Sequence, residues 1–416
     1  VLNGEKMWIT NGGFADAFIV FAKVDGEQFS AFIIERGFDG VMSGQEEHKM
    51  GLVGSSTTPV ILQDVRVPAK NLLGEVGRGH KVAFNVLNYG RFKLGASTMG
   101  SCKLALGESA RYSAERHQFG QPIANFGAIK HKIGEMVTRT YAIESMVFRT
   151  AGLLDAMLGE HKSIDDAALV AALEEYAIES SILKVTGSEY LHYILDENVQ
   201  IHGGNGFVKD YPAERHYRDS RVNRIFEGTN EINRLLIPGM LVKRGLQGAL
   251  PLVAAAKNIQ NELLSPNQRP ELSDRPLAQQ ETTIRMIKKV GVAMLGLAMQ
   301  TYGEKLSEQQ EVLSLVSDIL MDTYASESVV LRAQSASKAA KATAELQRDA
   351  ASVFVNDAAM RVEVSARTAV TAMAEGDALR THLAAVRRLL KVTPVNTVAI
   401  RQKLADRAVQ QAGYIF

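Results

Sequence analysis

The spacing of apolar residues changes near residue 79 of this chain, and that change limits the folds it can adopt. Before it, short apolar runs rich in Phe, Ile and Val are separated by Gly, Ser and Thr, as β-strands and their turns require. After it, apolar residues recur with the 3.6-residue period of helices. The sequence therefore predicts an α+β chain in which a small antiparallel β domain precedes helical bundles.

The β segment contains three clear candidate strands. Residues 17–24 and 29–35 are apolar runs joined by the turn-forming pair Asp25-Gly26, and residues 60–67 form a third run that Pro68 closes. Short strands with Gly-, Ser- and Thr-bearing connections favour a small antiparallel barrel or sandwich.

Four long helices are predicted after the change of period, and few helix breakers interrupt them. Ser163 and Asp166 resemble a capping box at the start of the third, with Asp in place of the usual Glu or Gln. Long helices with short connections pack as an antiparallel bundle. The predicted helices cover residues 80–117, 126–157, 164–195 and 229–245.

A cluster of prolines separates this bundle from the rest of the chain. Pro251, Pro266, Pro270 and Pro276 lie in a stretch without a strong helical pattern, which is typical of a linker. Beyond it the chain is rich in Ala, Glu, Lys and Arg, and it is predicted to form a second helical bundle. The predicted domains are 1–75 (β), 76–245 (helical), 246–278 (linker) and 279–416 (helical).

Composition excludes several functions. The chain has 416 residues, with 47 Lys plus Arg against 46 Asp plus Glu, and this balance argues against a nucleic-acid binder. One cysteine, Cys102, excludes an intrachain disulfide framework and fits a reducing compartment. The nine histidines show no metal-ligand spacing, so no metal is expected. The apolar run 290–299 is far shorter than a membrane span and is read as a buried helix.

Three stretches have compositions that packing alone does not require. The first, residues 6–13, carries the chain's one tryptophan, Trp8, before Thr10 and two glycines. An indole beside a hydroxyl could stack on a planar ring and donate a hydrogen bond to it. A core tryptophan followed by a tight turn explains the same pattern.

The second stretch, Arg116 to Pro122, follows a long predicted helix. Arg116 beside freed backbone N–H groups could bind a phosphate, and a cation that stabilises a helix C-terminus is the simpler alternative.

The third stretch combines residues 200–207 (QIHGGNGF) with residues 225–231 (IFEGTNE). Helices surround its glycines, so the strand–loop–helix unit of a Rossmann site is absent, and residues 74–79 lack the Lys-Ser/Thr of a Walker loop. Glu227 precedes a glycine and the predicted N-cap Thr229. A carboxylate there could serve chemistry, or it could simply be stabilised by the helix dipole.

The order WITNGG, RHQFGQP, QIHGGNGF and RIFEGTNEINRL resembles the acyl-CoA dehydrogenase family over residues 1–245. The remainder is similar to the extra C-terminal helical domain of the very-long-chain subgroup. Gly127 supports that subgroup, because medium- and short-chain members usually carry Gln at this position.

The resemblance implies FAD as the cofactor, held between the β domain and the helical bundle. Trp8 and Thr10 match residues beside the flavin ring, and Arg91 matches a substrate-site residue near the CoA and the base. Positions 116–119 and 200–204 match the two halves of a site for the FAD of a neighbouring subunit. The matched cofactor-binding residues are Trp8, Thr10, Arg116, Gln118, Phe119, Gln200, Gly203, Gly204, Thr229 and Asn230.

Glu227 matches the catalytic base of the family. The α-proton of an acyl thioester is weakly acidic, so its removal requires a positioned base and stabilisation of the developing enolate. The implied reaction converts a long-chain acyl-CoA to a trans-2-enoyl-CoA and reduces FAD. Burial is expected to raise the pKa of Glu227. Some relatives place the base immediately before the residue matching Arg91, where this chain has Gly90.

The resemblance also implies an electron-transferring flavoprotein as acceptor and a homodimer. Alternatives are an acyl-CoA oxidase and a non-catalytic scaffold for respiratory-complex assembly. The apolar residues Leu252, Val253, Ile259, Leu263 and Leu264 indicate either peripheral membrane contact or a docking helix. The expected location is the cytoplasm in a bacterium, and the mitochondrial matrix or inner-membrane surface in a eukaryote.

The chain begins at Val1 inside a strand-and-turn pattern, with no targeting sequence. We expect a fragment that lacks the family's N-terminal helical domain and therefore has weak or no activity. Equal turnover by a version with that domain restored would contradict this expectation.

Overall fold

A computed structural model describes residues 1–159, 166–264 and 275–416 and divides the chain into two compact units. The β unit comprises Val1–Gly90 with Arg218–Val222, and the helical unit comprises Arg91–Tyr217 with Asn223–Phe416. Each unit is described by itself. The predicted cap Ser163 and the linker prolines Pro266 and Pro270 lie outside the described residues.

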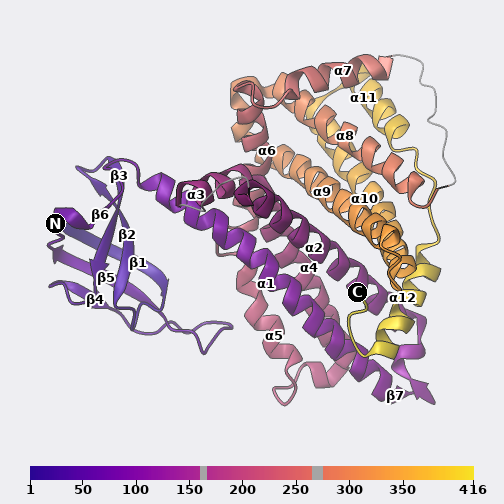
Figure 1. Cartoon of the computed structure of the whole chain (residues 1–416), viewed down its shortest axis with the longest axis horizontal. Coiled ribbons are helices and arrows are strands. Elements are labelled where there is room, and N and C mark those ends of the chain that lie inside the picture. The colour runs from indigo at the N-terminus through magenta and orange to yellow at the C-terminus, as the bar shows by residue number, and fades with distance from the viewer. Residues whose placement is uncertain (160–165, 265–274) are drawn as a thin grey trace. The chain divides into compact units, whose positions relative to one another are not determined.

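The β unit contains two three-stranded antiparallel sheets, with strand orders β1-β5-β4 and β2-β3-β6 (Figure 1). Phe18 and Ile34 from one sheet pack with Val60 and Leu62 from the other, so the core lies between the sheets. Of the barrel and the sandwich that the sequence left open, the structure shows the sandwich. The strands are β1 (Leu2–Thr10), β2 (Ala17–Val24), β3 (Gln28–Glu35), β4 (Val41–Ser43), β5 (Thr57–Val65) and β6 (Leu72–Leu73).

Asp25 and Gly26 join β2 to β3 as predicted. Both have left-handed backbones, with φ of 51° and 77°, which is the geometry of a tight hairpin turn matched to the twist of the strands.

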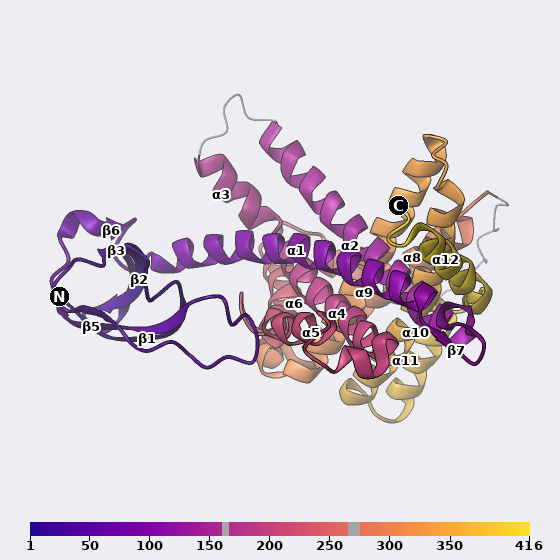
Figure 2. The ribbon, with the colours of Figure 1, turned by 90° about the horizontal axis from the view of Figure 1, so that it is seen from below.

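The rest of the described chain is dominated by helices, and α1 is one long helix that begins in the β unit and continues into the helical unit (Figure 1 and Figure 2). The helices are α1 (Gly79–Glu115), α2 (Gly127–Gly159), α3 (Asp166–Glu175), α4 (Ala177–His202), α5 (Ala213–Ser220), α6 (Asn230–Leu246), α7 (Leu252–Leu264), α8 (Ala278–Tyr302), α9 (Gln310–Lys338), α10 (Ala344–Met373), α11 (Gly376–Leu389) and α12 (Thr397–Gln411).

The predicted helices are confirmed with two corrections. The third predicted helix, 164–195, is divided at Tyr176 into α3 and α4, although backbone hydrogen bonds continue on either side of the break. Its second part extends to His202, where Gly203 ends the helix with a φ of 58°. Helix α5 was not predicted, because its sequence AERHYRDS is too polar to show an apolar stripe.

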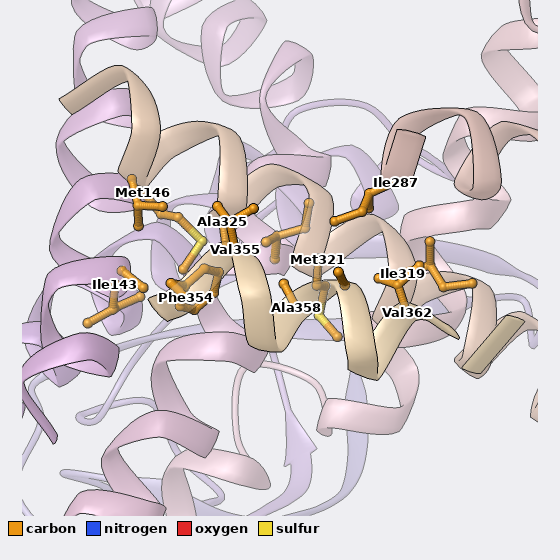
Figure 3. Packing of buried hydrophobic residues seen from close by; sticks show 14 of the residues in the cluster. Ile143, Met146, Ile287, Ile319, Met321, Ala325, Phe354, Val355, Ala358 and Val362 are labelled. Atoms are coloured by element: carbon orange, nitrogen blue, oxygen red, sulfur yellow. The ribbon is translucent and has the colours of Figure 1, made fainter. Parts of the chain in front are cut away.

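One hydrophobic core runs through the helical unit. Ile143 and Met146 of α2 belong to the same buried cluster as Ile319 of α9 and Phe354 of α10 (Figure 3). The two predicted helical domains, 76–245 and 279–416, therefore share a core within one compact unit, and the β unit includes residues up to Gly90.

The predicted linker 246–278 is corrected over Leu252–Leu264, which form α7. Ala256 and Ile259 are buried, and Ala256 lies so close to Gly296 of α8 that a Cβ added to that glycine would meet the Ala256 methyl at 2.7 Å. Lys289 of α8 also pairs with Glu262. Helix α7 thus docks on the helical unit through its apolar face, as one of the two alternatives for this stretch predicted.

Among the described residues, no helix is both long and apolar enough to cross a membrane. The same ranges contain no group of three or more His, Cys, Asp and Glu side chains that could hold a metal ion.

Candidate active site

The residues singled out from the sequence lie in three places. Trp8 and Thr10 are on β1 of the β unit. Arg91, Glu227, Thr229 and Asn230 lie around one turn of the helical unit, residues 225–230, which we name the Glu227 turn. The remaining residues lie at the far ends of α1 and α4.

The Glu227 turn precedes α6 and has an unusual backbone. Glu227 and Gly228 have φ of 59° and 78°, and a left-handed conformation costs a residue other than glycine about 1 kcal/mol. Thr229 is the N-cap of α6, where its hydroxyl oxygen accepts a hydrogen bond from the backbone N–H of Ile232 at 3.3 Å. The predicted N-cap is confirmed.

Two buried side chains hold the backbone of the turn. Arg91 of α1 donates from Nε to the carbonyl oxygen of Glu227 at 3.1 Å. Asn233 of α6 donates from Nδ2 to the carbonyl oxygens of Glu227, Gly228 and Thr229 at 3.4, 2.9 and 3.0 Å. A Cβ at Gly228 would lie 3.2 Å from Asn233 Nδ2 and 3.4 Å from Arg91 Nη2, so this position suits glycine.

Asn230 turns its side chain into the helical unit. Its Oδ1 accepts from Lys184 Nζ of α4 at 2.7 Å, and its Nδ2 donates to Glu189 Oε1 at 3.0 Å. Asn230 and Lys184 are both buried. The turn is therefore fixed from α1, α4 and α6 together, which is how a strained backbone is maintained at a functional site.

The Glu227 carboxyl is half-buried and near three cations. Burial raises its pKa above the ordinary glutamate value, as predicted, while Arg91, Lys184 and Lys93 oppose the rise. A carboxylate with a raised pKa, on a rigid turn, has the properties required of a general base. Stabilisation by the helix dipole alone explains neither the raised pKa nor the bracing of the turn.

The second group begins where α1 ends. Residues 116–122, which we name the Arg116 hairpin, contain β7 (His117–Gln118) paired with β8 (Gln121–Pro122). Phe119 and Gly120 form the turn, with φ of 51° and 82°. Arg116 and Gln118 are exposed, and the Phe119 ring is 92% exposed with one edge contact to Phe126.

The end of α4 lies beside this hairpin. Tyr112, one helical turn before Arg116, donates from its hydroxyl to the carbonyl oxygen of His202 at 3.2 Å and stacks on the His202 ring. Asn205 in turn donates to the Tyr112 hydroxyl at 3.1 Å. Gln200, Gly203 and Gly204 are exposed at this end, so the two predicted halves of the dinucleotide site come together within one helical unit.

The hairpin and the Glu227 turn are far apart. Arg91 and the last residue of α1, Glu115, are separated by 24 positions, about 36 Å along an α-helix. The helical unit therefore carries two separate groups of predicted site residues, one at each end of this part of α1.

In the β unit, Trp8 is 71% exposed and has a φ of 55°, within an irregular stretch of the β1–β5 pairing between Lys6 and Ile9. The alternative of a core tryptophan is therefore wrong. Thr10 is also exposed and pairs with Thr57, and the tight turn predicted after it is present, with Asn11 at a φ of 61°.

Sequence reasoning missed Lys184, Glu189, Asn233 and Tyr112. Lys184 interrupts the apolar run Ile182-Leu183-Lys184-Val185, and a lone cation in a buried stripe is a signal that could have been used. Asn233 lies inside the motif RIFEGTNEINRL but had no feature that distinguished it from a surface asparagine.

Family models match most of the chain. The acyl-CoA dehydrogenase middle domain matches residues 1–65, and two models described as the acyl-CoA dehydrogenase C-terminal domain match residues 77–240 and 286–388.

Known proteins extend this similarity. A "Probable acyl-CoA dehydrogenase" of Bacillus subtilis is 47% identical over 409 residues, which are 97% of this chain and 69% of the relative. The human mitochondrial very long-chain specific acyl-CoA dehydrogenase is 41% identical over 245 residues, 57% of this chain. An acyl-CoA dehydrogenase from Bacillus anthracis, solved in complex with FAD, superposes with a TM-score of 0.96 at 46% identity and covers all of this chain.

The chain is shorter than these proteins. It spans 71% of the B. anthracis chain and 35% of the human enzyme.

Proposed function

Because the chain belongs to the acyl-CoA dehydrogenase family, we propose that the protein oxidises a long-chain acyl-CoA to its trans-2-enoyl-CoA with FAD as cofactor. The observation that carries the proposal is the Glu227 turn. It presents a half-buried carboxylate with a raised pKa on a backbone held by Arg91 and Asn233.

Glu227 takes the α-proton of the acyl thioester in this proposal. Its raised pKa lets the carboxylate accept a proton from a weak carbon acid more readily than an ordinary glutamate would. Arg91, Lys184 and Lys93 oppose the rise, because a nearby cation favours the ionised carboxylate. Gly90, which precedes Arg91, has no side chain that could compete as the base.

The exposed residues fit the proposed cofactor. FAD, when bound, would accept the hydride equivalent that leaves the β-carbon. The Arg116 guanidinium and the open backbone at Gly203-Gly204 suit its phosphates, because no atom beyond the adjacent residues lies within 4 Å of a Cβ added to either glycine. Exposed rings of Trp8 and Phe119 offer flat apolar surfaces, and the Thr10 hydroxyl offers a hydrogen bond.

The separation along α1 supports a homodimer. The Arg116 hairpin and the Glu227 turn, about 36 Å apart, are too distant for one bound dinucleotide to reach both within one chain. We propose that the hairpin of one chain serves the FAD of its partner.

Chain-length preference and electron acceptor are further parts of the proposal. Similarity to the very long-chain specific enzyme supports a long acyl chain. Gly90 also removes a side chain next to Arg91 and is compatible with a wide pocket. An electron-transferring flavoprotein as acceptor follows from the family resemblance.

The experiment is anaerobic mixing of the FAD-loaded chain with palmitoyl-CoA while the visible flavin band is recorded. The flavin of the wild-type chain is expected to bleach. The flavin of Glu227→Gln should bleach about 10²- to 10⁴-fold more slowly, which is the usual contribution of a general base. Glu304→Gln, at an exposed position on a remote 3₁₀ turn, is the matched control and should bleach normally. Unchanged bleaching in Glu227→Gln would contradict the assignment of the base, and failure of the chain to hold added FAD would contradict the cofactor site.

A further inference from the structure

Lys184 is a buried cation that takes no direct part in the proposed proton transfer. It lies on α4 with a fully buried side chain, between the buried residues Leu183 and Val185. Its Nζ donates to the neutral amide oxygen of Asn230 at 2.7 Å rather than to a carboxylate. Burying an ammonium group with a neutral partner is costly, because the charge loses its hydration without gaining an opposite charge in contact.

One neighbouring carboxylate is already engaged by another cation. Glu189, one helical turn beyond Lys184 on α4, accepts two hydrogen bonds from Arg234, at 2.7 and 2.9 Å. Arg234 also donates to Asp318 of α9 at 2.8 Å. Because Glu189 already compensates Arg234, much of the Lys184 charge stays available to act on other groups.

Those other groups include Glu227. The charged groups around Lys184 are Arg91 on α1, Glu189 on α4, Glu227 in the turn and Glu231 on α6. Burial and neighbouring Arg91 lower the pKa of Lys184 to about 8, so the ammonium is charged at neutral pH. Around Glu227 the cations are Arg91 and Lys93 on α1 and Lys184 on α4.

We propose that Lys184 is a positioning residue for the proposed dehydrogenation, anchoring the Glu227 turn through Asn230 while its buried charge helps to set the pH at which Glu227 becomes a base. A role of Lys184 in catalysis rests on the proposed function, because it requires Glu227 to be the catalytic base. Its physical content, an electrostatic coupling between Lys184 and Glu227, does not depend on any substrate.

The sign of the effect follows from the charges. Burial favours the protonated form of Glu227, and the Lys184 cation favours the ionised form. Without this cation the pKa of Glu227 rises further, and the carboxylate is present only at higher pH. The interaction acts through a partly buried region, where opposite charges are screened less than in bulk water, so its loss should be measurable as a shift of the Glu227 titration.

Two substitutions separate the charge from the hydrogen bond. Lys184→Met removes both, whereas Lys184→Gln removes the charge and keeps an N–H donor for Asn230. Lys132→Met is the matched control, because Lys132 is a half-buried lysine of the same unit that pairs with Glu197 and is absent from the cations acting on Glu227.

The test is a carbon-13 NMR titration of the full chain labelled at the glutamate carboxyl carbons. The Glu227 signal is assigned by its absence from Glu227→Gln. We expect its midpoint to move up in both Lys184 variants and to stay unchanged in Lys132→Met. If Lys184→Met does not fold, Lys184→Gln alone is decisive.

Three results would overturn the proposal. Both Lys184 variants could titrate as wild type, Lys184→Gln could restore the wild-type midpoint while Lys184→Met shifts it, or Lys132→Met could shift it equally. Flavin bleaching by the wild-type chain then separates the two proposals. A midpoint that shifts in the Lys184 variants, while palmitoyl-CoA does not bleach the flavin of the wild-type chain, would contradict the proposed function. Normal bleaching by the wild-type chain, with an unshifted midpoint in the variants, would contradict only the role of Lys184.

Discussion

The Glu227 turn and the Arg116 hairpin use the same local geometry but are held in different ways. Each places a non-glycine residue in the left-handed region just before a glycine, Glu227-Gly228 in one case and Phe119-Gly120 in the other. The hairpin satisfies this geometry locally, through the pairing of β7 with β8. The Glu227 turn instead depends on side chains from α1, α4 and α6.

The difference corresponds to the two tasks proposed for these regions. A catalytic base needs a pKa shifted from its ordinary value, and such a shift requires a partly buried group next to fixed charges. A contact for phosphates and flat rings needs groups that are not already occupied, and the hairpin leaves Arg116, Gln118 and Phe119 exposed. Substitutions should therefore affect stability and chemistry together at the turn, and binding alone at the hairpin.

The largest expected effect on stability is that of Asn233→Ala. Asn233 is fully buried, and its loss removes a donor shared by three carbonyl oxygens of the Glu227 turn. The Glu227 carbonyl keeps Arg91 and the Thr229 carbonyl keeps a backbone N–H, so the Gly228 carbonyl is the one left without a donor. We expect a loss of about 2–3 kcal/mol of unfolding free energy, measured by urea denaturation, together with slower bleaching. Asn258→Ala, at an exposed position on α7, should leave both unchanged. A stable Asn233→Ala chain with normal bleaching would show that the turn needs no bracing.

Arg116→Ala should have a smaller effect, confined to binding. Removing an exposed guanidinium that contacts a phosphate is expected to weaken FAD binding about tenfold, with the melting temperature of the FAD-free chain unchanged. A fluorescence titration of FAD measures this. Arg380→Ala, which removes an exposed guanidinium on α11, is the control. Equal affinities in the two variants would remove the hairpin from the cofactor site.

Thr229→Ala should have the smallest effect of the three substitutions. The hydroxyl that caps α6 is lost, at a cost of about 1 kcal/mol in unfolding free energy. Thr229→Ser keeps a capping oxygen and should restore most of that stability. If Ser fails to restore it, Thr229 stabilises the turn through its methyl group rather than as a cap.

Much of this arrangement could be predicted from local sequence, and the rest could not for identifiable reasons. The change of period gave the order of strands and helices, and Thr229 before an apolar run is a local cap signature. The bonds of Lys184 with Asn230 and of Arg91 with Glu227 join residues 46 and 136 positions apart, so no local pattern encodes them. Helix α5 was missed because it is polar, and α7 because nearby prolines suggested a linker.

The most direct test of the central claim is the pH dependence of flavin bleaching by palmitoyl-CoA in the wild-type chain. A base with a raised pKa gives a rate that falls as the pH is lowered through a single acid limb, because protonated Glu227 cannot take the α-proton. We predict a midpoint clearly above the ordinary pKa of glutamate. A limb at the ordinary glutamate value, or the same limb persisting in Glu227→Gln, would contradict the claim that the surroundings of this turn prepare Glu227 for catalysis.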